Sequence, residues 1–179
     1  MKNLCVFGIL TTDEGMRIKS EMYSWLEPLY NIFPVEQEPP GSLYEYPALY
    51  FTIRLAIDSK LPVLYIHTKG AGHPKCHFQS SVRNMWKHEY GNSSRIGDYF
   101  NGKTDAVVTT PISGPHNITW FNSFVITPKA ATILLPHFHF DSDRFYYEQQ
   151  MLNIPNMRVN GILGSNKSDI EAIDIAKQF

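Results

Sequence analysis

Four polar residues that follow one apolar run offer the clearest chemistry in this 179-residue sequence. Residues 63–66 (Val-Leu-Tyr-Ile) are compact and β-rich, and His67, Thr68, Lys69 and Gly70 come directly after them. Such a run with polar flanks predicts a strand that is buried on both faces of an open α/β sheet. Ligands bind beyond the carboxyl ends of the strands in such sheets, so we expect these four residues to contact a ligand.

The chemistry that this segment offers is recognition of phosphate. Lys69 can neutralise a phosphate as a point charge, and His67 can donate a hydrogen bond to it or ligate a metal. Gly70 lets the backbone approach a ligand closely. The alternative is an ordinary turn, in which the lysine is solvated and the histidine is satisfied by the backbone.

A second segment contains candidate substrate-binding residues. The residues Gly114-Pro115-His116 precede an aromatic stretch that contains Asn122 and Ser123. Buried asparagine and serine side chains need hydrogen-bond partners, which the hydroxyl groups of a ligand could supply. His116, Asn122 and Ser123 are therefore candidates for substrate binding, and the alternative is that the asparagine and the serine pin neighbouring loops.

Glu148 is the candidate general base. It lies between Tyr147 and Gln149, close to the apolar residues Met151 and Leu152. A carboxylate beside aromatic surface can have a raised pKa and can accept a proton from a substrate hydroxyl. The alternative is an exposed glutamate on a helix.

Histidine and cysteine at residues 73–77 (His-Pro-Lys-Cys-His) resemble half of a zinc site. A structural zinc ion needs four ligands, and no second pair follows at zinc-finger spacing. We interpret the segment as a polar loop that Gly70 and Gly72 could hinge over the site as a lid. The sequence therefore assigns no residue as a metal ligand.

The elements that must position these residues indicate an α/β domain. Over the first 70 residues the pattern predicts strand, helix, strand, helix and strand, at 3–10, 13–30, 32–35, 43–58 and 62–67. This order is typical of a parallel sheet with crossover helices. Further along, we expect helices at about 78–90, 128–135, 142–153 and 168–178, strands at about 105–109, 119–127 and 162–163, and a loop at 111–117.

Composition limits the class of protein. Hydrophobic residues make up 43% of the chain and charged residues 18%, which supports one domain with a full core. A net charge of -1 gives no footprint for nucleic acid, and two cysteines make no disulfide framework, which favours the reducing cytoplasm. We find no apolar stretch of the roughly 18 residues that a membrane span needs, which leaves peripheral membrane contact open. Aromatic residues at 13% also indicate a partner surface, for example in a homo-oligomer.

Taken in order, four motifs resemble a group of bacterial glycosyltransferase-like proteins. The motifs are Tyr44-Glu45-x-Pro47, the segment 63–70, Gly114-Pro115-His116 with the strand Trp120-Phe121-Asn122-Ser123, and Arg144-Phe145-Tyr146-Tyr147-Glu148. Proteins of this group are typically associated with the synthesis of capsule and lipopolysaccharide sugars. The resemblance runs from about residue 3 to 153 and implies a GT-A-type fold, in which a Rossmann-like, mixed but mostly parallel sheet is flanked by helices.

The resemblance implies a cytoplasmic enzyme that moves a sugar from a nucleotide-sugar donor to a saccharide acceptor. Residues 1–70 would form the donor side of a single domain, 71–153 the acceptor side, and 154–179 a C-terminal extension. In this interpretation His67 and Lys69 stabilise the leaving phosphate, and Glu148 is the base on the acceptor hydroxyl if the enzyme inverts, the sequence leaving open whether it retains or inverts. The donor would be bound by Thr11, Thr68, Lys69 and Gly70. The residues His116, Asn122 and Ser123 would bind substrate, with Asn122 and Ser123 holding hydroxyls of the donor or the acceptor.

The chain departs from the typical GT-A pattern after the donor-site strand. Typical GT-A enzymes carry an Asp-x-Asp motif there, where a divalent metal bridges the diphosphate, whereas this chain has residues 67–69 (His-Thr-Lys). Its Asp-x-Asp sequence, Asp141-Ser142-Asp143, comes much later, at the start of an expected helix. Lys69 could replace the charge of the metal, and the sequence leaves the use of Mn²⁺ or Mg²⁺ open. Two alternatives are a non-catalytic sugar-nucleotide-binding or interaction protein on the same fold, and a metal-dependent hydrolase built on the seven histidines.

Overall fold

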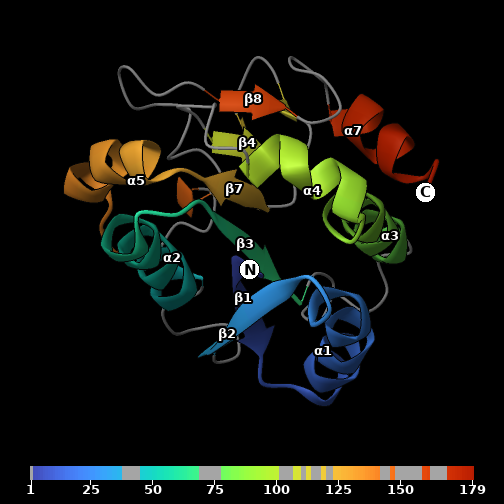
Figure 1. The fold of residues 1–179 in the computed structure, drawn as a ribbon. Coiled ribbons are helices and arrows are strands. Elements are labelled where there is room, and N and C mark those ends of the chain that lie inside the picture. The colour runs from blue at the N-terminus through green and yellow to red at the C-terminus, as the bar shows by residue number, and fades with distance from the viewer. Residues whose placement is uncertain are drawn as a thin grey trace.

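The computed structural model describes residues 2–37, 45–68, 78–100, 123–141 and 169–179, and the short segments 107–109, 112–113, 118–119, 146–147 and 159–161. These residues form an α/β structure in which a mixed sheet lies between two layers of helices (Figure 1). None of the helices in this part of the chain combines the length and the apolarity that are needed to cross a bilayer.

The first half of the fold is the predicted β-α-β-α-β unit. Its elements are β1 (Asn3–Leu10), α1 (Asp13–Leu26), β2 (Tyr30–Gln37), α2 (Tyr46–Ser59) and β3 (Val63–His67). β1 pairs in parallel with β2 on one side and with β3 on the other. The prediction of a parallel sheet with crossover helices is therefore confirmed for this half.

The second half adds shorter strands and the remaining helices. They are α3 (Gln79–Tyr90), α4 (Ser93–Phe100), β4 (Val107–Thr109), β7 (Phe124–Ile126), α5 (Pro128–Leu134), the 3-10 turn η2 (Leu135–His137), β8 (Val159–Gly161) and α7 (Asp169–Ala176). The main sheet has the order β2-β1-β3-β7-β4-β8. β7 is antiparallel to both of its neighbours, and β4 and β8 are parallel. The expected mixed, mostly parallel sheet flanked by helices is confirmed at this level.

Both faces of the sheet are covered by helices. α1, α3 and α7 lie on one face and α2 and α5 on the other, at the right and the left of Figure 1. Side chains alternate between the two cores, so Leu64 and Ile66 pack toward α1 and α3, while Val63 and Tyr65 pack toward α2 and α5. This alternation confirms that the apolar run at 63–66 is a strand buried on both sides.

Two helices differ from the sequence-based expectations, each for a local reason. The first helix ends at Leu26 rather than near residue 30, because Pro28 has no backbone N–H with which to continue the hydrogen-bond pattern of the helix. The sequence pattern does not predict α4, since Ser93, Ser94 and Gly97 are weak helix formers.

The prediction of a loop at 111–117 is wrong for residues 112–113, which form the strand β5 (Ile112–Ser113). This strand pairs with β6 (Ile118–Thr119) in a second, two-stranded sheet. The expected long strand at 119–127 is consequently wrong at its start, because β6 and β7 belong to different sheets. A strand, β8, lies at 159–161, and the expected strand at 162–163 lies outside the described residues. Of the expected helix at 142–153, only Tyr146 and Tyr147 are described, and both are helical.

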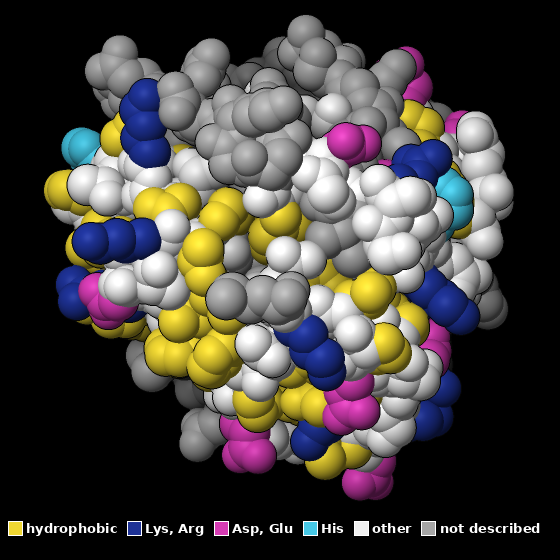
Figure 2. All heavy atoms as spheres, viewed as in Figure 1, with side chains coloured by type: hydrophobic (Ala, Val, Ile, Leu, Met, Phe, Trp, Pro, Cys, Tyr) yellow, Lys and Arg dark blue, Asp and Glu magenta, His cyan; other side chains and the backbone are white. Residues whose placement is uncertain are grey.

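Large apolar side chains are also exposed in the described part of the chain. Figure 2 shows hydrophobic side chains gathered over the region of α2 and α5, with charged side chains spread around them. The large exposed ones are Met16, Tyr50, Phe51, Leu61, Phe140 and Phe179.

Candidate functional site

The candidate site lies at the carboxyl ends of the parallel strands β1 and β3, where the strand order of the sheet reverses. From β1 the chain passes through α1 to β2 on one side, and from β3 it passes through α3 and α4 to β4 on the other side. In open α/β sheets such a reversal leaves a crevice beyond the two carboxyl ends, which is where ligands bind. We refer to this place as the carboxyl edge.

Thr68 joins the two strands at the carboxyl edge. Its backbone N–H donates to the carbonyl of Gly8 over 2.9 Å, and its hydroxyl oxygen accepts the N–H of Leu10, also over 2.9 Å. The side chain is buried, so this predicted donor-binding residue has a structural role in addition. Thr68 thereby fixes the spacing between β1 and β3.

Thr11 joins β1 to β2 in the same way. Its N–H and its hydroxyl both donate to the carbonyl oxygen of Gln37, over 3.0 and 3.2 Å. Unlike Thr68, it is exposed. The structure therefore places Thr11 at the carboxyl edge, as predicted, in a position that solvent or a ligand can reach.

His67 lies at the centre of the edge and is buried, with 8% of its surface exposed. Its Nδ1 is 3.7 Å from Oε1 of Glu45, the residue that precedes α2. Its ring stacks on Tyr65 at a centroid distance of 6.0 Å and contacts the tilted ring of Trp86 at 5.6 Å. The histidine is thus held between a carboxylate and two aromatic rings from three different elements.

Glu45 is a further functional candidate. From the sequence alone, a glutamate at this position is already accounted for by its place near the N-terminus of a helix. The signal for a further role is its position in the motif Tyr44-Glu45-x-Pro47. The structure adds the contact with His67. No periodicity or spacing in the sequence indicates this contact, because the whole of α2 and most of β3 lie between the two residues.

Gly8 brings Gln37 close to His67 across β1. A Cβ atom at Gly8 would lie 2.8 Å from Nε2 of Gln37 and 3.2 Å from Cβ of His67. The missing side chain therefore makes the space in which these two polar residues approach each other. A side chain at this position would displace the amide end of Gln37 and press on His67.

Buried polar atoms near His67 lack a hydrogen-bond partner among the described residues. They include Nε2 of Gln37 and Nε1 of Trp86, whereas the hydroxyl of Tyr65 interacts with the side chains of Gln37 and Glu45. Burial, and secondly the negative charge of Glu45, raise the pKa of Tyr65 well above its ordinary value, so its hydroxyl keeps its proton. A buried donor without a partner costs about 1–3 kcal/mol, which makes these groups suited to binding the oxygen atoms of a ligand.

Ser123 reaches the same edge from β7. Since β7 is antiparallel to β3, with Phe124 opposite Tyr65, the residue before Phe124 lies near the carboxyl end of β3. Ser123 is fully buried, and its hydroxyl has no partner among the described residues. The expectation that this serine is buried and in need of a partner is confirmed.

The structure thus brings together four of the predicted site residues, Thr11, His67, Thr68 and Ser123. Lys69, Gly70, His116, Asn122 and Glu148 lie outside the described residues. Within the described part of the chain, no three His, Cys, Asp or Glu side chains are grouped so that they could hold a metal ion.

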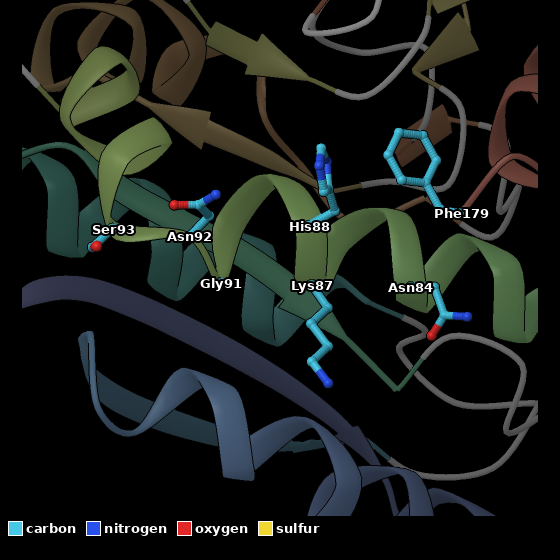
Figure 3. Close-up of a pocket in the computed structure, with 7 residues that line it drawn as sticks. All are labelled: Asn84, Lys87, His88, Gly91, Asn92, Ser93 and Phe179. Carbon is cyan, nitrogen blue, oxygen red and sulfur yellow. The ribbon is translucent and has the colours of Figure 1, made fainter.

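A separate hollow of about 650 Å³ lies beside the end of α3. Tyr30, the first residue of β2, donates to the carbonyl of Tyr90, which places this end of the helix at the amino side of the sheet. Figure 3 shows Lys87 and His88 pointing to opposite sides of α3, with Phe179 on the side of His88. Because these side chains do not converge, we place the site at the carboxyl edge and not in this hollow.

Comparisons of the chain with protein-family models, with curated proteins and with solved structures found no match. The account of the site accordingly depends on the geometry described above.

Proposed function

We propose that the carboxyl edge binds a nucleotide-activated sugar and that the protein transfers the sugar to a saccharide acceptor. The observation that carries the proposal is the position of His67. It is buried beside Glu45 at the carboxyl end of β3, where the strand order reverses between β1 and β3. The resemblance of the sequence motifs to bacterial glycosyltransferase-like proteins supplies the chemical class of the ligand. We assign the fold to the GT-A type on the same grounds, the parallel first half and the mixed second half being what that type implies.

In this proposal the carboxyl edge stabilises charge on the leaving group. The acceptor hydroxyl attacks the anomeric carbon, the bond to the diphosphate oxygen breaks, and negative charge develops on that oxygen. Glu45 lies 3.7 Å from the ring of His67 and orients it, and His67 together with Lys69 stabilises the diphosphate. If the reaction inverts the anomeric carbon, Glu148 takes the proton of the acceptor hydroxyl. Asn122, Ser123 and His116 hold sugar hydroxyls.

The experiment that tests the donor site is a calorimetric titration of nucleotide sugars into two matched variants. His67→Gln removes the imidazole at the carboxyl edge, and His88→Gln removes an exposed imidazole on α3, away from that edge. We expect affinity to fall roughly tenfold or more for His67→Gln, the scale of one charge-assisted hydrogen bond, and to be unchanged for His88→Gln. Equal affinities for the two variants would show that the donor does not bind at His67.

Turnover separates the proposed enzyme from the non-catalytic alternative. Release of nucleoside diphosphate in the presence of a saccharide acceptor is expected of the enzyme. Tight, His67-dependent binding with no release for any acceptor would instead identify a sugar-nucleotide-binding protein on the same fold.

A further inference from the structure

A cluster of aromatic side chains lies beside the carboxyl edge, on the face that α2 and α5 cover. We call it the aromatic cluster, and it consists of Tyr46, Tyr50, Phe138, Phe140 and Tyr146. Tyr46 directly follows Glu45, the residue that contacts His67, and α5 packs against α2. The chain after α5 therefore returns to the start of α2, which places the cluster next to the proposed donor site.

Two rings of the cluster, Phe140 and Tyr50, are exposed to solvent, and the other three are partly buried. Tyr46 stacks on Phe138 at a centroid distance of 5.4 Å and an interplanar angle of 3°, and on Tyr50 at 5.8 Å and 23°. Phe140 meets Tyr46 edge-on, at 5.9 Å and 84°. Phe140 is 47% exposed and Tyr50 is 40% exposed.

Hydrogen-bonding groups are interleaved with these rings. The hydroxyl of Tyr146 donates to the carbonyl of His137 over 3.0 Å and lies 3.0 Å from Nδ1 of His139. Nε2 of His139 is 3.8 Å from Oδ2 of Asp141. The side chains of His139 and Asp141 are 65% and 34% exposed, so both can still contact a ligand.

We propose that the aromatic cluster binds the saccharide acceptor, an inference that rests on the proposed function for the identity of this second substrate. A pyranose ring has an apolar face of C–H groups and a rim of hydroxyls. The negative face of an aromatic ring attracts the polarised C–H groups, and the carboxylate of Asp141 and the imidazole of His139 complement the hydroxyl rim. The exposed rings together with a carboxylate and an imidazole offer both the apolar and the polar contacts that a saccharide uses, whereas a lipid chain would use the rings alone.

The test is a titration of neutral oligosaccharides, from trisaccharides to hexasaccharides with glucose, galactose and N-acetylhexosamine units, without nucleotide. We expect wild type to bind at least one of them. Phe140→Ala and Tyr50→Ala should each weaken that binding roughly five- to tenfold, the scale of one ring contact, whereas Phe140→Tyr should retain it. Phe179→Ala removes an aromatic ring of 36% exposure at the C-terminus and should leave the affinity unchanged.

Three outcomes would overturn the inference: no saccharide binds to wild type, binding survives both alanine variants, or Phe179→Ala weakens it equally. Because Phe140 and Tyr50 are exposed, both variants should fold, which circular dichroism checks. Titration of nucleotide sugars into the same samples keeps the two proposals apart. If nucleotide sugars bind but saccharide binding does not depend on Phe140 and Tyr50, the acceptor site alone is refuted. If saccharide binding depends on these rings but nucleotide sugars do not bind, the donor site alone is refuted.

Discussion

At the scale of the residue, the candidate site depends on side chains that join neighbouring strands and bring polar groups together. Thr68 uses its hydroxyl to accept the N–H of Leu10, and Gly8 leaves room for Gln37 beside His67. The sequence indicates His67 and Thr68 because polar residues follow an apolar run. It does not indicate Gln37 or Glu45, because their role depends on contacts between strands and helices that are distant in the chain.

Replacing Thr68 by valine tests the joining role of its hydroxyl. Valine has nearly the same shape but cannot accept the N–H of Leu10, which would lose its partner in a partly buried place. We expect Thr68→Val to lower the free energy of unfolding by about 1–3 kcal/mol in urea titrations. Thr68→Ser keeps the hydroxyl and should lose less, so a serine variant as unstable as the valine variant would refute this role.

At the scale of the element, the order of strands and helices in the first half follows from patterns in the sequence. Apolar runs and the cap at Thr12, whose hydroxyl accepts the N–H of Gly15, mark β1 and the start of α1. The second half is harder to predict, since β5, β6 and β7 are only two or three residues long. Strands this short have too few residues to show a period, and their partners decide which sheet they join.

Two glycine-to-alanine replacements test how closely α1 packs against the end of β1. A Cβ atom at Gly15 would lie 1.9 Å from the backbone oxygen of Leu10, which cannot move aside as a side chain can. We expect Gly15→Ala to lower the free energy of unfolding by about 1–3 kcal/mol or more. A Cβ atom at Gly97, in α4, would meet no described atom within 4 Å, so Gly97→Ala should be neutral or stabilise by about 0.5–1 kcal/mol.

Urea denaturation followed by circular dichroism measures both glycine variants. A Gly15→Ala protein as stable as Gly97→Ala would show that α1 does not sit directly on the end of β1.

At the scale of the whole molecule, the sheet is covered on both faces, and Cys5 lies at the centre of the layer under α1 and α3. The apolar run that contains Cys5 predicts its burial, and the structure confirms it. The two-sided cover could be predicted because β1 and β3 are apolar on both faces. The antiparallel insertion of β7 could not, because strand direction depends on the connections and not on the strand's own residues.

Burial raises the pKa of the Cys5 thiol, which makes stability depend on pH. The folded state keeps the proton, whereas the unfolded chain loses it above a pH of about 8.5. The contribution of Cys5 is therefore complete below that pH and falls by up to about 1.4 kcal/mol per pH unit above it. Between pH values of about 8.5 and 10, urea titrations in a Cys76→Ser background should show this slope, and adding Cys5→Ala should reduce it. An identical slope in the two proteins would contradict the assignment to Cys5.

The measurement that tests the central claim most directly is the melting temperature of the protein with UDP-, GDP-, dTDP- and CMP-sugars, each with and without manganese. A ligand at a hundred times its Kd adds about 2.7 kcal/mol of stability, which raises the melting temperature of a domain of this size by several degrees. The account predicts such a rise for one nucleotide class, and its loss in His67→Gln. Unchanged melting temperatures across the panel at millimolar ligand would contradict a nucleotide-sugar site at the carboxyl edge.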